Sequence, residues 1–75
     1  MTVRIFGQLQ DIVGSNSIEF EEAADTNALI GQLQSKYPAL KHAKYKVAVN
    51  RNIIQSNMVL QQDAEIALLP PFSGG

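Results

Sequence analysis

The chain ends on the stretch EIALLPPFSGG, residues 65–75, which joins a strand pattern to an unusual terminus. The residues from Ile66 to Leu69 are apolar on both faces of an extended segment, which is typical of a strand at the centre of a sheet. Pro70 and Pro71 lack the N–H donor that would continue the hydrogen-bond ladder, so the strand is predicted to end at Leu69. The pattern predicts a central strand, a stiff neck and a terminus of two residues without side chains.

Three other stretches alternate polar and apolar residues with the period of a half-buried strand. TVRIF (2–6) places Val3 and Ile5 on one face, and SIEFE (17–21) does the same with Ile18 and Phe20. KVAVNRNIIQ (46–55) gives two inward valines, a turn at residues 50–52 and a short return strand, because Asn tolerates left-handed backbone geometry. Between the first two strands, GQLQDIVG (7–14) is long enough for a turn of helix or a loop between glycines.

DTNALIGQLQSKYP (25–38) is the best helix candidate. Asp25 or Thr26 can cap its first free N–H groups, and Pro38 cannot continue the helical ladder, so the helix is predicted to end near Lys36. Gly31 in mid-helix costs about 1 kcal/mol relative to Ala, and we expect a close approach to a sheet as its reason. Its apolar stripe consists of Leu29, Ile30, Leu33 and Tyr37.

These elements predict an α+β fold, with one mixed sheet packed by one main helix. Seventy-five residues make one domain. A chain of this size buries only about 60% of the surface that its unfolded form exposes, which leaves little room for an internal active site. We therefore place the globular domain at residues 1–69 and an extended C-terminal tail at residues 70–75.

Composition excludes several classes of protein. The chain has no cysteine, which removes disulfides, thiolate metal sites and a cysteine nucleophile. Its first residues lack the apolar core of a signal peptide and no apolar run could span a bilayer, so we expect a cytoplasmic protein without membrane contact. Residues 36–52 carry five cationic side chains and no acid. We expect an ordinary solvated surface there and not a nucleic-acid site, since no aromatic or Gly-rich signature accompanies the lysines.

The side chains do not form the converging set that a conventional enzyme needs. His42 is the only histidine, and no nucleophile accompanies it in the sequence. Glu21 and Glu22 are neighbours, which point to opposite faces of a strand and so cannot flank one substrate. The sequence also has no phosphate-binding Gly loop, no metal-ligand spacing and no GxGxxG fingerprint. We therefore expect no bound cofactor and no metal.

The terminus remains as the candidate reactive group. By chance, two terminal glycines occur in roughly 0.5% of chains, since Gly is about 7% of residues. The six residues PPFSGG reach on the order of 20 Å when extended, far enough to enter a pocket of another protein. Gly74 and Gly75 have no Cβ, so they can pass a narrow channel and leave the terminal carbonyl open to attack. An α-carboxylate with a pKa of about 3.3 to 3.7 is ionised at neutral pH, so it must be activated before it can react as an electrophile.

At this point the whole chain resembles the small, sulfur-carrying subunit of molybdopterin synthase, a ubiquitin-like β-grasp family. VRIFGQLQDIVG (3–14) is similar to the family's first strand and its (A/G)xLxExxG segment, and EIALLPPFSGG is similar to its last strand and PPxxGG terminus. Two positions depart from the family pattern. Asp63 stands about where a turn glycine is usual, and Gln10 stands where a basic residue is frequent.

The resemblance implies a mechanism centred on Gly75. An adenylyltransferase related to ubiquitin-activating enzymes would use ATP to convert the Gly75 carboxylate to an acyl adenylate, and sulfur from a persulfide would replace AMP to leave a thiocarboxylate. The tail would then enter the large subunit of the synthase and donate sulfur to a pyranopterin precursor, in a complex expected to be a heterotetramer. On this view the protein is a non-catalytic sulfur donor. Gly74 gives access, Pro70 and Pro71 aim the tail, and Phe72 anchors the neck.

Phe6 and Leu69 are candidates for the surface that docks the partner, with a core position as the alternative for both. Three other functions stay open. The sulfur carrier for thiazole formation in thiamin synthesis shares the fold and the terminal Gly-Gly, although its tail usually lacks the double proline. A ubiquitin-like modifier would join Gly75 to lysines of other proteins, and a β-grasp adaptor would not use its glycines at all.

Overall fold

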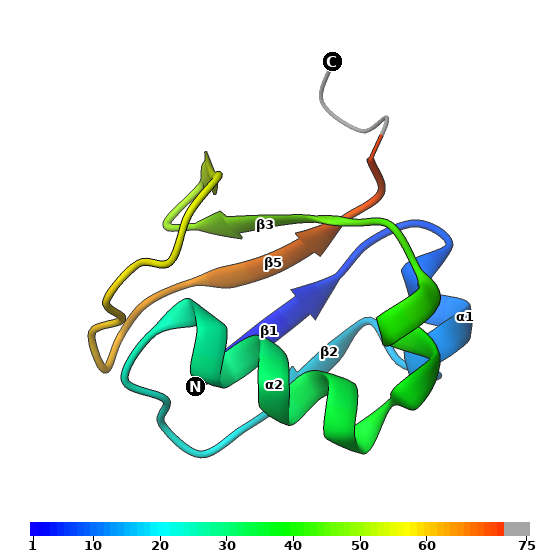
Figure 1. Ribbon diagram of the computed structural model, residues 1–75, viewed down its shortest axis with the longest axis horizontal. Helices are drawn as coiled ribbons and strands as arrows, with labels where there is room; N and C mark the ends of the chain where they lie inside the picture. Colours follow the sequence, from blue (N-terminus) through cyan, green and yellow to red (C-terminus); the bar gives the residue numbers. More distant parts are fainter. Residues whose placement is uncertain (72–75) are drawn as a thin grey trace.

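The structure, a computed structural model, describes residues 1–71. Its strands form one mixed sheet in the order β2-β1-β5-β3-β4, and α2 packs across one face of it (Figure 1). This is the α+β, β-grasp architecture expected from the sequence. In chain order the elements are β1 (Thr2–Ile5), α1 (Leu9–Val13), β2 (Ser17–Glu19), α2 (Thr26–Lys36), the 3₁₀ helix η1 (Pro38–His42), β3 (Lys46–Val49), β4 (Asn52–Ile54) and β5 (Ile66–Leu69).

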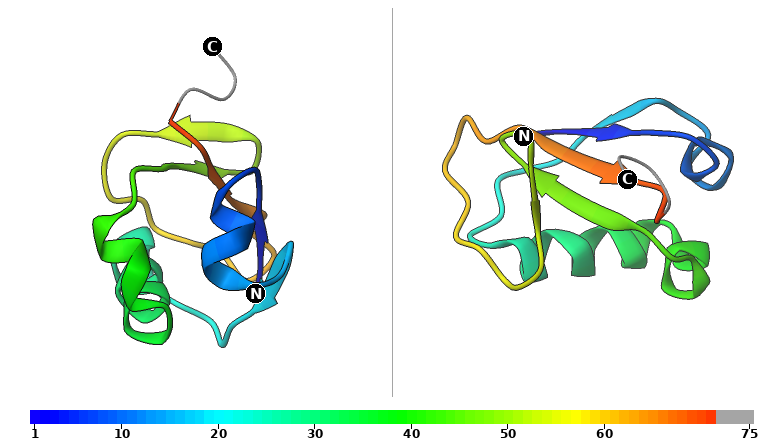
Figure 2. Two further views of the ribbon diagram at one scale, coloured as in Figure 1. Left: turned by 90° about the vertical axis from the view of Figure 1, so that its right-hand side faces the viewer. Right: turned by 90° about the horizontal axis from the view of Figure 1, so that it is seen from above.

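The last strand lies at the centre of the sheet, as its two apolar faces predict. β5 pairs in parallel with β1, where Val3 is opposite Ile66, and antiparallel with β3, where Lys46 is opposite Leu69. β1 also pairs antiparallel with β2, and the connection between them contains α1. Because β1 and β5 run parallel, their C-terminal ends lie side by side at one end of the sheet. The C-terminal neck leaves the sheet from that end (Figures 1 and 2).

The core lies between the sheet and α2. Val3 and Ile5 of β1, with Ile66 and Leu68 of β5, point to the helix side and are almost completely buried. From the helix, Leu29 and Leu33 are fully buried against them, as the apolar stripe predicted. Burying each such side chain contributes about 1.5–3 kcal/mol, and this layer therefore fixes the orientation of β5 and of the neck that follows it.

The N-terminus of α2 is held by a network that reaches far along the chain. Asp25 is the N-cap, and its side chain accepts a hydrogen bond from Ala28 N at 2.9 Å. Asn57 Oδ1 accepts one from Asn27 N at 2.8 Å, while Asn57 Nδ2 donates to Asp25 Oδ2 at 3.2 Å. The pKa of Asp25 is lowered from its ordinary value of 3.8, first by the bond from Ala28 and then by the bond from Asn57. The segment before β5 is thereby attached to the start of the helix.

Some local predictions need correction. β2 ends at Glu19, so Glu21 and Glu22 follow the strand and do not belong to it. Gly31 does not approach the sheet, because a Cβ built on it meets no atom within 4 Å. The expected turn at residues 50–52 is present, with positive φ at Asn50 and at Arg51. Within residues 1–71, no helix has both the length and the apolar character needed to cross a membrane.

Candidate functional site: the base of the C-terminal tail

The neck begins with one buried and one exposed proline. β5 ends at Leu69, Pro70 is buried and Pro71 is exposed. A proline cannot donate to the neighbouring strand, so the sheet stops here and the chain can leave it. Phe6 N donates to Leu68 O at 3.1 Å, and this is the last hydrogen bond that joins the β1 end to β5 before the neck. The predicted stop at Leu69 is therefore confirmed.

Gly7 lies directly against the first proline of the neck. A Cβ built on Gly7 would lie 2.5 Å from Cγ of Pro70, closer than carbon atoms can approach without a shift. Gly7 also has a φ of +61°, in the left-handed region that favours glycine. The bend after β1 and the absence of a side chain thus open the space that Pro70 fills. This contact fixes where the tail leaves the globule.

The face of the sheet turned away from α2, which we call the outer face, surrounds this exit. By register, Arg4 is opposite Ala67, which is opposite Ala48, and Leu69 is opposite Lys46. Residues opposite each other on neighbouring strands share a face. Phe6, one residue beyond β1, continues the alternation onto the same face. None of these apolar side chains belongs to the core cluster.

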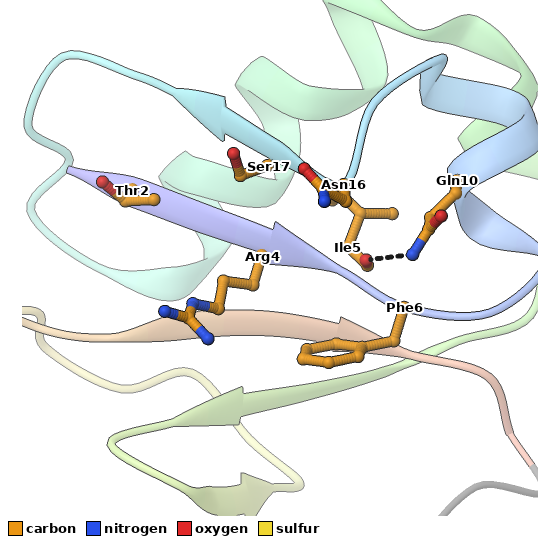
Figure 3. A pocket seen from close by; sticks show the side chains of 7 residues that line it. All are labelled: Thr2, Arg4, Ile5, Phe6, Gln10, Asn16 and Ser17. Atoms are coloured by element: carbon orange, nitrogen blue, oxygen red, sulfur yellow. Dashed lines mark hydrogen bonds between the residues drawn. The ribbon is translucent and has the colours of Figure 1, made fainter.

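Phe6 and Leu69, the two predicted docking residues, are therefore on the outer face and not in the core. The Phe6 side chain is 40% exposed and Leu69 is half-buried. In Figure 3 the Phe6 ring and the Arg4 side chain both extend toward β5, whereas Gln10 turns away and donates to Ile5 O at 3.1 Å. A hollow of about 440 Å³ opens beside them, lined by Thr2, Arg4, Ile5, Phe6, Gln10, Asn16 and Ser17.

The remaining predicted site residues, Phe72, Gly74 and Gly75, lie outside the described residues. No local sequence pattern marks Gly7 as a site residue, because its contact with Pro70 joins opposite ends of the chain. Nor does a local pattern mark Arg4 or Lys46 on the outer face as site residues. The alternation along β1 could have placed Arg4 on the face that Val3 and Ile5 do not occupy. Only the register shows that both cations flank β5.

The other titratable side chains form no second site. Among residues 1–71, no group of three or more His, Asp or Glu side chains could hold a metal ion. His42 is in the last turn of η1, as part of the surface segment that connects α2 to β3. We therefore take the base of the tail, where the PPFSGG motif begins at Pro70, as the candidate functional site.

Known proteins resemble this chain over essentially its whole length. Residues 3–75 match the model of the ThiS family. The chain is 31% identical to the molybdopterin synthase sulfur carrier subunit of Mycobacterium tuberculosis, over 100% of this chain and 96% of that protein. It is 28% identical to the protein of the same name from Haemophilus influenzae, over 100% and 99% of the two chains.

Solved structures show the same fold. A chain in the complex of subunits 1 and 2 of molybdopterin-converting factor from Helicobacter pylori is 30% identical, with a TM-score of 0.73 and coverage of 99% of this chain and 96% of that one. The small archaeal modifier protein 1 of Methanosarcina acetivorans is 24% identical, with a TM-score of 0.83 and coverage of 99% and 94%. At that identity the second likeness concerns the fold alone.

Proposed function

This chain belongs to the ThiS family, and we propose that it acts as the sulfur carrier subunit of a molybdopterin synthase. The observation that carries the proposal is the pair of full-length relatives that bear this name, together with a terminus, PPFSGG, that fits the chemistry. The structure supports it with a fixed neck at the edge of the sheet. The protein contributes its own terminus as a co-substrate, and the catalytic groups belong to its partners.

The chemistry is proposed to take place at the carbonyl carbon of Gly75. The carboxylate attacks the α-phosphate of ATP, so that pyrophosphate leaves and an acyl adenylate forms. The terminal sulfur of a persulfide then attacks the carbonyl carbon and AMP leaves. A second thiol cleaves the resulting acyl disulfide, which oxidises the two thiol sulfurs to a disulfide and releases the Gly75 thiocarboxylate. Each thiocarboxylate delivers one sulfur to a pyranopterin precursor, so the dithiolene requires two carriers.

The described residues position this terminus. Pro70, wedged against Gly7, sets the point of exit, and the ring of Pro71 keeps the φ of Pro71 itself near −65°. Phe6 and Leu69 lie beside the exit and offer apolar area to a partner. We propose that this patch docks the protein whose pocket receives the tail, that Phe72 anchors the neck there, and that Gly74 lets the terminus pass a narrow entrance.

Two partners follow from this proposal. One is the large subunit of the synthase, which the Helicobacter pylori complex of subunits 1 and 2 supports. Two carriers and two large subunits would form a heterotetramer. The other is an adenylyltransferase that binds ATP, and both reactions would take place in the cytoplasm. Each partner must release the carrier to the other, so we expect the two to use overlapping parts of the outer face.

Two alternative functions are compatible with the comparisons, the first through the fold alone and the second through the name of the family model. The small archaeal modifier proteins share the fold, which is compatible with attachment of Gly75 to protein lysines. The family model carries the name ThiS, which is compatible with a sulfur carrier for thiazole formation. The double proline and the names of the full-length relatives favour the molybdopterin route.

Deletion of Gly75 tests the proposal against a simple adaptor function. The variant of residues 1–74 should still bind the large subunit through the outer face, but it should transfer no sulfur to the pyranopterin precursor. The intact chain, treated in parallel, is the control. Normal dithiolene formation with the shortened chain would refute the proposal. Formation of a thiazole and no dithiolene by the intact chain would assign it to the thiamin route.

A further inference from the structure

The outer face carries two cationic side chains beside the exit of the tail. Arg4 is opposite Ala67 on one side of β5, and Lys46 is opposite Leu69 on the other side. Both residues therefore flank the central strand on the face that carries Phe6 and Leu69. Between them lie Ala67, which is half-buried, and Ala48, which is buried, so no long side chain separates the two cations on β5. The result is a shallow apolar strip with a cation on each side.

Neither cation forms an ion pair with an acid of the described residues, although Glu19 and Glu65 lie diagonally from Arg4 on the same face. The ion pairs within residues 1–71 join the N-terminal ammonium to Glu19 at 3.7 Å and Arg51 to Glu65 at 3.6 Å. Arg4 is exposed, and the hollow that it lines with Phe6 and Asn16 contains no acidic side chain. Because the two acids are already paired with other cations, Arg4 and Lys46 still contribute positive potential to the surface around the neck.

The acids nearest to this face lie at its other end. Glu19 is opposite Thr2 at the start of β1, and Glu65 directly precedes β5. Both engage in the two ion pairs above, and Glu19 also accepts a hydrogen bond from the Thr2 hydroxyl. Because β1 and β5 are parallel, these acids lie at the edge opposite the neck. Lys46 therefore lies at the neck end of the face, the two paired acids lie at the other end, and Arg4 lies between them.

A third cation, Lys44, extends the positive region around the neck. Lys44 lines a hollow of about 450 Å³ together with Pro71, and Asp11 is the one acid among the residues that line it. Lys44 and Lys46 belong to the acid-free segment of residues 36–52 that composition alone assigned to ordinary solvated surface. The fold brings the middle of that segment to the base of the tail.

We infer that the outer face docks a protein surface whose carboxylates meet Arg4 and Lys46 around an apolar patch that covers Phe6 and Leu69. This inference rests on the proposed function, since the partner is the one that receives the tail. Arg presents a planar fork that pairs bidentately with a carboxylate, whereas Lys acts as a point charge. Such rim charges mainly accelerate association and fix orientation. Here they would align the neck with the entrance of the partner's pocket.

The association rate of the full-length chain with the molybdopterin synthase large subunit of the same organism tests this inference. It is measured by stopped flow from low to high salt for the wild type, Arg4→Gln, Lys46→Gln and the double variant. Lys41→Gln, which removes the same charge from an exposed residue of η1 that forms no ion pair in the described residues, is the matched control. The wild-type rate should fall steeply with salt, and the double variant should associate about tenfold more slowly at low salt, with most of its salt dependence lost. Lys41→Gln should behave as the wild type.

Several results would overturn the inference. Equal rates for the wild type and the double variant, or faster association of the double variant, would show that no carboxylates face these cations. Sedimentation that shows a dimer abolished by Arg4→Gln would assign the face to a second copy of this chain. Binding of a mixed-sequence oligonucleotide in competition with the large subunit would assign it to nucleic acid. If the wild type binds no large subunit at any salt concentration, the proposed function fails as well. Normal binding and sulfur transfer by all variants reject the charge inference alone.

Discussion

Gly7 and Pro70 are in contact across the edge of the sheet, at a distance that leaves no room for a Cβ on Gly7. The contact joins the bend after β1 to the first residue after β5. It therefore couples the two parallel central strands to the direction of the neck. A glycine and a proline are both required, because the first yields space and left-handed backbone geometry while the second ends the strand.

Gly7→Val should lower the free energy of unfolding by about 3 kcal/mol. A side chain at positive φ costs roughly 1–2 kcal/mol, and crowding against Pro70 adds about 1–3 kcal/mol. Gly14→Val is the matched control, because Gly14 has a φ of +80° but open space around its Cβ position. Urea denaturation of both variants isolates the contact. Equal losses for the two would show that Pro70 is not held by Gly7.

Gly31→Ala should stabilise the protein by about 0.5–1 kcal/mol. Gly31 lies inside α2, where Ala restricts the unfolded chain and favours the helix, and no atom is close enough to hinder a methyl group. Thermal or urea unfolding measures the gain, with sulfur-carrier activity unchanged since the residue is remote from the neck. A loss of stability would mean that the helix packs more closely at this position than the structure shows.

Asn57→Ala should raise the pKa of Asp25 toward 3.8, because it removes one of the two hydrogen bonds that lower it. The folded-state pKa of Asp25 lies below the unfolded value, so its ionised form stabilises the fold above about pH 4, and this contribution is lost as the pH falls through 3.8 and then through the folded pKa. NMR titration of the Asp25 carboxyl gives the shift directly.

The same variant should also lose about 1 kcal/mol of stability at neutral pH, from the broken hydrogen bonds to the start of α2. Gln55→Ala, in the same exposed segment, is the control. An unchanged Asp25 titration in Asn57→Ala would show that the link between the two side chains does not persist in solution.

Phe6→Ser should weaken binding to the large subunit by about tenfold or more, since a central aromatic residue of an interface contributes more than 1 kcal/mol. Ile53→Ser is the matched control, because Ile53 is equally exposed at 44% but lies on the edge strand β4. Calorimetric titration of both variants compares the two ends of the outer face. A larger effect at Ile53 would move the docking surface away from the neck.

Local chemistry predicted the elements of this fold better than it predicted their contacts. Asp25 as a cap, the end of the helix near Lys36 and the central position of residues 66–69 all follow from patterns within a few residues. Two contacts could not be predicted in this way, because each joins segments that are far apart in the sequence. They are the hydrogen bond from Asn57 to Asp25 and the contact between Gly7 and Pro70. The prediction that Gly31 allows a close approach between the helix and the sheet was wrong for the same reason, because packing between distant segments cannot be read from a local pattern.

The site was predicted in the same uneven way. The terminal glycines and the double proline indicated a reactive tail because their chemistry is local. Lys44 and Lys46 were assigned to ordinary surface and Arg4 was not singled out, because only the pairing of β1 and β3 with β5 brings Arg4 and Lys46 to the same face.

The most direct test of the account is the intact mass of the full-length chain after incubation with ATP, a sulfur donor and the activating enzyme. The account predicts the replacement of one oxygen by one sulfur, located at Gly75 by fragmentation, and the reversal of this change after transfer to the pyranopterin precursor. An unchanged mass, or a chain recovered only in an amide bond to protein lysines, would contradict it.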